Sequence, residues 1–291
     1  MTNDSASKPP LKAPRRLLAV MAHPDDETFG IGGTLALYAR QGVECHVVTA
    51  TGGEVGSAPA DLKGSASVAE MREHELRCAA AVLGLASVSF LGYRDSGMAG
   101  TPDNQHPGCL AMAAPDQVAR QVAAHIRRLR PQVLITHDPS GGYGHPDHIA
   151  THWASLAAVS LAGDPGLDLD SLPPWTVGKV YYHVLSLTSL RWMLRVLPLL
   201  GIDPRHFGRN RDIDLVMILQ DASPVHAVIT LGDMRAVKAE ASACHSSQSG
   251  GATGPWAWLM RWVNRYERFT RAIPEGTAGP VERDLFAGIE G

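Results

Sequence analysis

Three side chains that can bind a metal crowd into a short stretch near the N-terminus of the 291-residue chain. The sequence Ala-His-Pro-Asp-Asp-Glu, residues 22–27, contains His23, Asp25 and Asp26. Carboxylates this close repel one another unless a cation or a proton relieves them. Nitrogen and oxygen ligands without a thiolate suit zinc, and another divalent ion such as Fe²⁺ can use the same set. The alternative is that Pro24 forms a turn and one aspartate caps the following helix.

A second cluster lies more than a hundred residues downstream, in the run Gly-Gly-Tyr-Gly-His-Pro-Asp-His at 141–148. Pro146 favours a helix start, so His145 precedes the first turn and His148 falls within it. Residues three apart on a helix share a face, and both imidazoles can therefore address one point. His152 shares that face and is a competing ligand, although no glutamate follows the first histidine as in metalloproteases. The two motifs together predict a metal site more strongly than either does alone.

Alternating strand-like and helix-like segments must bring these motifs together. Strands are expected at 15–22, 43–49, 88–91 and 132–137, and helices at 33–40, 68–83, 115–130 and 146–161. This alternation predicts an α/β fold, a Rossmann-like three-layer domain with a mostly parallel sheet and helices on both faces. Ligands of such sheets bind beyond the carboxyl ends of the strands. Both motifs follow strands, so one crevice should contain them.

The later part of the chain continues the same alternation. Strands are expected at 179–185, 214–219 and 227–231, and helices at 234–245 and 256–270. The last helix would carry a row of aromatic side chains along one face. Such a row favours packing in the core or in a dimer interface over stacking against a sugar. The row consists of Trp256, Trp258, Trp262, Tyr266 and Phe269. With no linker-like composition, we predict one domain at 15–273, a flexible N-terminal tail at 1–14 and a C-terminal tail or arm at 274–291.

Composition narrows the classes of function. Lys and Arg number 26 against 29 Asp and Glu, and this lack of a basic excess argues against nucleic acid as the partner. The apolar stretch 185–200 is too short and too charged for stable membrane insertion. The glycines at 30–33 depart from the dinucleotide-binding spacing, so no nucleotide cofactor is expected. Four scattered cysteines and no secretion signal predict reduced thiols in a cytoplasmic protein, with homo-oligomerisation left open.

The two motifs resemble those of a known family. Ala-His-Pro-Asp-Asp-Glu and Gly-His-Pro-Asp-His are similar to the motifs of the PIG-L/LmbE-like N-acetylglucosaminyl deacetylases, which are zinc hydrolases on a Rossmann-like fold. The resemblance covers about residues 15–152 and becomes looser afterwards, apart from Lys238 and His245–Gln248. Residues 94–98 and 141–148 are most similar to the branch that serves low-molecular-weight thiol biosynthesis, of the mycothiol or bacillithiol type.

The resemblance implies a deacetylase that hydrolyses the acetamide of an N-acetylglucosaminyl substrate, releasing acetate and a free amino sugar. His23, Asp26 and His148 are implied as ligands of Zn²⁺, leaving an open coordination position for water. Asp25 is implied as the general base that takes a proton from that water.

Other residues of the same motifs are implied to act on the substrate. Protonated His145 and the Tyr143 hydroxyl would stabilise the oxyanion, and either Asp25 or His145 would protonate the leaving amine. Asp147 would hold His145 in one tautomer.

Sugar contacts are implied for three more residues, each with a simpler alternative. Arg72 and Asp95 match residues that contact sugar hydroxyls in the thiol branch. The alternative for Arg72 is a solvated charge on a helix, and the alternative for Asp95 is an aspartate that forms a turn. Glu54 faces the expected crevice or caps its loop.

Two other functions stay open at this stage. One is a metal-dependent amidase that acts on a thiol S-conjugate or a glycoside antibiotic. The other is a non-catalytic sugar- or nucleotide-binding module, which would have no use for a base, metal ligands and an acid together.

Overall fold

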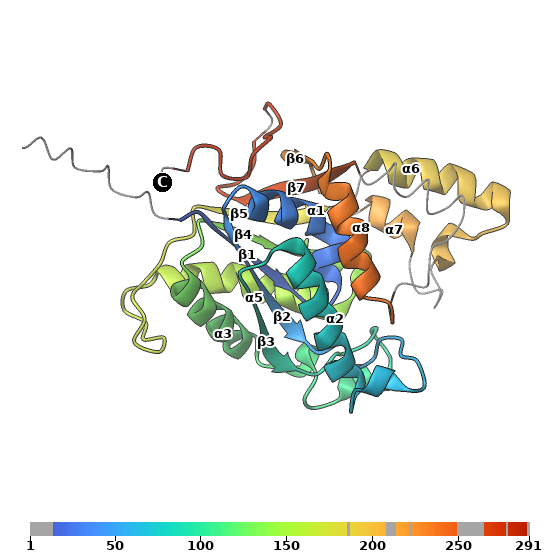
Figure 1. Cartoon of the computed structure of the whole chain (residues 1–291), viewed down its shortest axis with the longest axis horizontal. Coiled ribbons are helices and arrows are strands. Elements are labelled where there is room, and N and C mark those ends of the chain that lie inside the picture. The colour runs from blue at the N-terminus through green and yellow to red at the C-terminus, as the bar shows by residue number, and fades with distance from the viewer. Residues whose placement is uncertain are drawn as a thin grey trace, which may run out of the picture.

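A seven-stranded sheet forms the centre of the protein, seen here in a computed structural model (Figure 1). The structure describes residues 14–184, 187–207, 214–220, 223–248, 265–277 and 279–289. The strand order is β3-β2-β1-β4-β5-β7-β6. β1 to β5 run parallel, and β7 runs antiparallel to both β5 and β6. The predicted three-layer, mostly parallel α/β fold is confirmed.

The strands form where apolar residues run without interruption. They are β1 (Arg16–Met21), β2 (Glu44–Thr51), β3 (Ser87–Tyr93), β4 (Val133–Thr136), β5 (Lys179–Val184), β6 (Ala227–Thr230) and β7 (Tyr266–Ile273). In β1, Leu17 and Ala19 enter the core on one face of the sheet, while Leu18 and Val20 enter the core on the other. Burial on both faces is what a parallel strand requires, and it explains the near-continuous apolar sequence.

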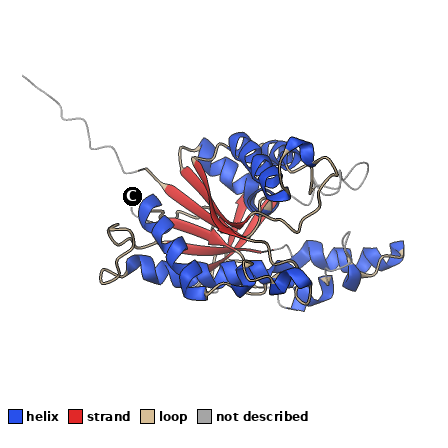
Figure 2. Cartoon of the chain, turned by 90° about the horizontal axis from the view of Figure 1, so that it is seen from below, coloured by secondary structure: helices blue, strands red, loops and turns tan. Residues whose placement is uncertain are grey.

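Helices cover both faces of the sheet (Figure 2). α1 (Asp26–Arg40), α2 (Val68–Leu83) and α8 (Met234–Cys244) pack together on one face, and α3 (Pro115–Leu129) and α5 (Pro146–Gly163) pack on the other. Their ends follow from the sequence. Ser67 caps α2 by accepting a hydrogen bond from the Glu70 amide, and Gly84 ends the same helix at a φ of 74°.

Three shorter helices lie near one end of the sheet. α4 (Gly141–Gly144) precedes α5, and α6 (Leu187–Val196) projects from the sheet with α7 (Leu215–Gln220) beside it (Figure 1). Short 3-10 turns lie at Leu62–Gly64, Pro102–Gln105, Leu110–Met112, Leu197–Leu200 and Pro204–His206.

Two expectations for the later part of the chain were wrong. The strand expected at 214–219 is helix α7, because a run of apolar residues this short does not distinguish a strand from a helix. The end of the helix expected at 256–270 is instead strand β7, where Phe269 is fully buried. The rest of the expected aromatic helix lies outside the described residues. In the segment 274–291, predicted to be a tail or arm, Leu285 and Phe286 pack into the core.

The cysteine expectation was also wrong in part. Cys78 on α2 and Cys244 at the end of α8 form a disulfide, with their Cα atoms 5.8 Å apart. The two residues are 166 positions apart in sequence, so spacing alone gave no sign of the pair. Cys45 and Cys109 are free and buried. Among the described helices, none combines the length and apolar character needed to cross a membrane.

The strand order explains where a site can form. From β1 the chain proceeds outward to β2 and β3 on one side, whereas β4 and β5 lie on the other side. The loops that follow β1 and β4 therefore diverge and leave a crevice at the carboxyl end of the sheet, which is where ligands bind in folds of this kind.

Candidate metal centre and catalytic pocket

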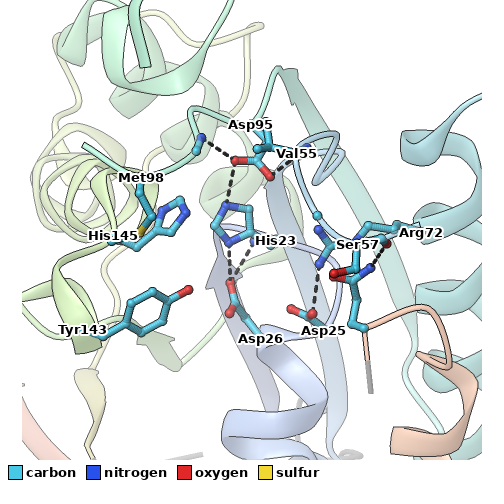
Figure 3. Close-up of a pocket in the computed structure, with 13 residues that line it drawn as sticks. His23, Asp25, Asp26, Val55, Ser57, Arg72, Asp95, Met98, Tyr143 and His145 are labelled. Atoms are coloured by element: carbon cyan, nitrogen blue, oxygen red, sulfur yellow. Dashed lines mark hydrogen bonds and ion pairs between the residues drawn. The ribbon is translucent and has the colours of Figure 1, made fainter. Parts of the chain in front are cut away.

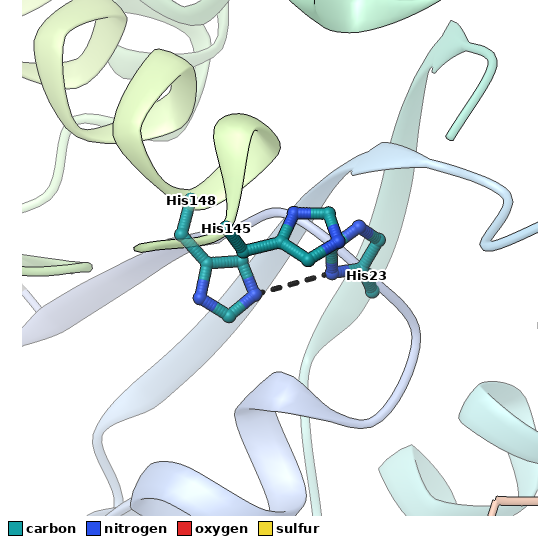
Figure 4. A group of neighbouring side chains, drawn as sticks. All are labelled: His23, His145 and His148. Atoms are coloured by element: carbon teal, nitrogen blue, oxygen red, sulfur yellow. Dashed lines mark hydrogen bonds between the residues drawn. The ribbon is translucent and has the colours of Figure 1, made fainter. Parts of the chain in front are cut away.

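The two sequence motifs meet at this crevice, although 125 positions separate His23 from His148. The Nδ1 atom of His23 lies 3.2 Å from the Nε2 atom of His148 (Figure 4). Carboxylate oxygens of Asp26 lie 3.5 Å from that His23 nitrogen and 3.4 Å from that His148 nitrogen. Ligands held about 2.0–2.1 Å from a tetrahedral ion lie about 3.3 Å from one another. The donor atoms of the three residues therefore have the spacing and chemistry of a metal site.

The electrostatics of Asp26 suit a metal ligand. Burial alone would raise the pKa of this carboxyl, but the imidazoles of His148 and His137 hold the pKa well below its ordinary value. The ionised carboxylate is the form that binds a cation.

His137 is near the centre but its ring is engaged elsewhere. Asp26, His137 and His148 form a second group whose donor atoms lie close together. The Nε2 atom of His137, however, accepts a hydrogen bond from the Ala22 amide at 3.0 Å. That contact ties the end of β4 to the end of β1 and leaves this nitrogen unsuited to a metal. His152, the competing ligand on α5, contacts the His137 carbonyl oxygen instead.

The carboxylate of Asp147 contacts His23, whereas its contact with His145, the histidine that we expected it to hold, is through the backbone amide. Its carboxylate lies 3.1 Å from the Nε2 atom of His23 and accepts hydrogen bonds from the amide and hydroxyl of Ser96. The side chain of Asp147 is fully buried. A carboxylate on the far nitrogen of a histidine fixes its tautomer and leaves the other nitrogen free for a metal. Asp147 thus orients the Nδ1 atom of His23 towards Asp26 and His148.

His145 lies beside the three donor atoms. Its ring centroid is 4.5 Å from that of His23, and its Nδ1 atom accepts a hydrogen bond from the Asp147 amide. Burial, with further contributions from His23 and His148, lowers the pKa of His145 to about 2. This environment favours the neutral imidazole, whereas we expected the protonated form.

Asp25 adopts an unusual backbone conformation at the N-cap of α1. Its φ is 137°, a value that residues with a side chain rarely adopt. The peptide is held in place because its carbonyl oxygen accepts from the amides of Thr28 and Phe29, while its own amide donates to Glu27. Strained residues of this kind occur preferentially at functional sites.

The carboxylate of Asp25 is aimed by an arginine. Arg72 on α2 donates to it at 2.9 Å (Figure 3). Arg72 also donates to the carbonyl oxygens of Pro24 and Gly53. Burial raises the pKa of Asp25 to about 6, with Arg72 opposing the rise. Arg72 is itself only 4% exposed, so it is not the solvated helix charge that the sequence left open.

These side chains line a cavity of about 390 Å³. Asp25, Asp26, His23 and His145 form its inner wall, and the Tyr143 hydroxyl points into it (Figure 3). The other lining residues are Val55, Gly56, Ser57, Arg72, Asp95, Gly97, Met98 and Gln248.

Asp95 and Glu54, two of the residues expected to contact the sugar, lie in different positions relative to the cavity. Asp95 lines the cavity and accepts hydrogen bonds from the amides of Val55 and Gly97. Glu54 does not line the cavity. Its carboxylate accepts a hydrogen bond from the Asp95 amide at 2.8 Å, as expected of a residue that caps its loop.

Residues after α8 close the site from behind, and the sequence gave only a weak sign of them. His245 is fully buried and its Nε2 atom lies 3.1 Å from a carboxylate oxygen of Glu27. Gln248 lines the cavity and donates to the Ser57 carbonyl oxygen. Only the similarity of the segment His245–Gln248 to the family could have indicated these two residues.

Comparisons with known proteins agree with this geometry. The PIG-L family, described as GlcNAc-PI de-N-acetylase, matches residues 18–159. A 1D-myo-inositol 2-acetamido-2-deoxy-alpha-D-glucopyranoside deacetylase of Thermobifida fusca is 48% identical, with 94% of this chain and 99% of the relative covered. A protein of the same description from Geodermatophilus obscurus is 38% identical over 95% of this chain and 99% of its own.

A solved structure is similar in fold. The N,N'-diacetylchitobiose deacetylase from Pyrococcus horikoshii aligns with a TM-score of 0.62 at 21% identity, covering 90% of this chain and 85% of the other.

Proposed function

The chain belongs to the PIG-L family and hydrolyses the acetamide C–N bond of an N-acetylglucosaminyl substrate, and from this premise we propose its substrate, its metal and the roles of its residues. The substrate that we propose is N-acetylglucosamine linked to an inositol, the compound named for its relatives. The observation that carries the proposal is the convergence of His23, Asp26 and His148 beside the strained Asp25.

We propose that His23, Asp26 and His148 hold one Zn²⁺ ion. Two imidazoles and one carboxylate are a common ligand set of catalytic zinc, and Fe²⁺ fits the same donors. When bound, the ion supplies Lewis acidity, which polarises the amide carbonyl and acidifies a water molecule. Asp147 keeps the Nδ1 atom of His23 free of a proton by accepting from the Nε2 atom.

Asp25 is the general base in this proposal. It lies next to Asp26 in sequence, and Arg72 fixes its carboxylate towards the cavity. A carboxyl with a pKa of about 6 is ionised near neutral pH yet retains more basicity than an ordinary aspartate. It therefore takes a proton from the attacking water.

Two further side chains of the cavity, Tyr143 and His145, act on the carbonyl oxygen and the leaving amine. The Tyr143 hydroxyl points into the cavity, where it can donate to the oxyanion as it forms (Figure 3). His145 lies against His23 and lines the same wall. The environment of His145 favours the neutral imidazole. We therefore assign the proton transfer to the leaving amine to Asp25, and His145 acts as a hydrogen-bond partner of the substrate.

The sugar binds on the side of the cavity formed by Arg72 and Asp95. Asp95 presents a buried carboxylate at the cavity wall, which suits hydrogen bonds from sugar hydroxyls. In this proposal Arg72 donates hydrogen bonds to both the sugar and Asp25. Glu54 acts indirectly, because it fixes the Asp95 backbone. A thiol S-conjugate is the second candidate substrate, since Val55 and Met98 add apolar surface at the same cavity.

Acetate release from N-acetylglucosaminyl inositol tests the proposal. Asp25→Asn should lower kcat by about 10²–10⁴-fold, the typical contribution of a general base, while zinc stays bound. Glu73→Gln, a carboxyl-to-amide change on the outer surface of α2, is the matched control and should be neutral. Full activity of Asp25→Asn would refute the assignment of Asp25 as the general base. The absence of acetate release by the unaltered protein would refute the proposed substrate.

A further inference from the structure

A second cavity, of about 250 Å³, lies directly behind the catalytic one. Asp26 and Tyr143 line both cavities, so the two cavities are neighbours. The other residues of the second cavity are Met21, Phe29, Gly30, Ile31, His137, Asp138, Gly142, His148 and His183. Neither motif on its own indicates this space, because its walls come from α1, α4, α5 and the ends of β1, β4 and β5.

Hydrocarbon groups dominate the surface that a ligand would meet there. Met21, Phe29 and Ile31 contribute apolar side chains, and two glycines contribute none. At Gly30 an added Cβ atom would lie 3.3 Å from the His183 ring, and both residues line the cavity.

Two polar side chains of this cavity accept hydrogen bonds within the protein. Asp138 accepts hydrogen bonds from the Gly142 amide at 2.8 Å and from the Ser140 hydroxyl at 2.9 Å. His137 accepts from the Ala22 amide. Such groups do not need a ligand to satisfy them, and the cavity offers no lysine or arginine to bind an anion. It suits an uncharged, apolar group.

We propose that this second cavity receives the acyl group of the scissile amide. The inference deepens the proposed function and rests on it. The carbonyl carbon must lie at the metal donors, and the group attached to that carbon must enter a neighbouring space that does not hold the sugar. A methyl group has about the volume of a water molecule, whose share of the liquid is about 30 Å³. A cavity of about 250 Å³ thus has room for several further methylene groups.

The consequence is an enzyme that hydrolyses amides longer than the acetamide. Water adds its oxygen to the carbonyl carbon, the C–N bond breaks, and the amine nitrogen receives the proton. The products of a longer substrate are the same amino sugar and the corresponding fatty acid anion. The unaltered protein should hydrolyse the N-butyryl compound with a kcat/KM within about tenfold of that for the N-acetyl compound.

The test compares kcat/KM for N-acetyl, N-propionyl, N-butyryl and N-hexanoyl forms of one glucosaminyl inositol. Gly30→Ala puts a methyl group into the cavity and should lower the ratio of N-butyryl to N-acetyl turnover by about tenfold, as expected for one methylene in an apolar pocket. The matched control is Gly32→Ala on the same helix, where an added Cβ makes only ordinary contacts at 3.6 Å. It should leave the ratio unchanged.

A variant that widens the cavity checks the opposite direction. Phe29 is 42% exposed at its rim, so Phe29→Ala should fold normally and raise N-hexanoyl turnover relative to N-acetyl turnover. Thermal unfolding of each variant separates a loss of fold from a change of preference, because loss of fold lowers all four rates together.

The possible failures are distinguishable. If the unaltered protein releases acetate but does not hydrolyse any longer amide, or if a Gly30→Ala variant that unfolds at the normal temperature lowers all four rates equally, the acyl proposal is wrong while the deacetylase stands. The same holds if Met98→Phe in the first cavity, rather than Gly30→Ala, changes the chain-length preference. If no substrate is hydrolysed at all, the proposed function itself is wrong.

Discussion

The first and last parts of the described chain contribute to the site in different ways. The proposed ligands and base lie in two short motifs, after β1 and around the start of α5. The segment after α8 carries no such motif, yet His245 contacts Glu27 and Ser247 contacts Glu75. The comparison suggests that the first part supplies the reacting groups and the second part holds them in position. Substitutions in the two parts should therefore have effects of different size and kind.

The largest effect is expected at His148. His148→Ala removes one of three proposed ligands, so we expect loss of the bound metal and a fall in kcat/KM of at least about 10³-fold, since the Lewis acid and its water are lost together. Metal content and turnover are measured on the same sample.

His152→Ala is the matched control, because His152 lies one turn further along α5 and contacts the His137 carbonyl oxygen instead. This variant should keep its metal. Loss of metal in His152→Ala with retention in His148→Ala would reverse the assignment.

A smaller effect is expected where a residue acts through a ligand. Asp147→Asn weakens the hold on His23 and should lower metal affinity by about 10–100-fold, the usual effect of such changes. Ser96→Ala should cost less, because the Ser96 amide still donates to Asp147. Competition with a chelator measures both affinities, and a greater loss in Ser96→Ala than in Asp147→Asn would contradict the arrangement.

In the holding segment, Glu75 should affect substrate affinity more than turnover. Its carboxylate accepts from Lys63 and from the amide and hydroxyl of Ser247, which positions Gln248 at the cavity. Glu75→Gln should raise KM several-fold with kcat nearly unchanged. A fall in kcat as large as the rise in KM would show that the segment takes part in the chemistry.

The same residue predicts a pH effect on stability. Burial raises the pKa of Glu75, but hydrogen bonds from Lys63 and Ser247 outweigh it and hold the pKa below its ordinary value. A depressed folded-state pKa adds stability above the unfolded-state value of about 4.3, and that stability is lost as the pH falls through the folded-state value. Denaturation midpoints of Glu75→Gln should therefore fall less steeply in acid than those of the unaltered protein.

The smallest effect on turnover is expected at the disulfide. Cys78 and Cys244 join α2 to α8, away from the reacting groups. Replacing both by serine should lower the free energy of unfolding by on the order of 2–5 kcal/mol, because the unfolded chain loses a long-range constraint. Urea denaturation with and without reductant is the measurement, and a reductant effect that persists in the double variant would contradict the pairing.

Much of the first part of the fold could be predicted because its signals are local. Uninterrupted apolar strands such as 16–21 and capped helices such as 68–83 lie close to their predicted bounds. The crevice followed from topology, since both motifs come after strands of one parallel sheet. The later part was harder, because a six-residue apolar segment such as 215–220 fits a strand or a helix equally well.

Within the site, residue types could be predicted but not their pairing. The sequence indicated that Asp147 holds a histidine, yet the contact of its carboxylate with His23 depends on side-chain directions fixed only by packing. The contacts of Glu27 with His245 and of Cys78 with Cys244 span 218 and 166 positions, and nothing local encodes them. The second cavity is likewise a product of packing, formed by several elements that meet.

Anomalous diffraction from crystals of the zinc-loaded protein tests the central claim most directly. The account predicts one peak, about 2 Å from the Nδ1 atom of His23, the Nε2 atom of His148 and a carboxylate oxygen of Asp26. A peak bonded to His137 or His152, or the absence of any peak at the carboxyl ends of β1 and β4, would contradict it.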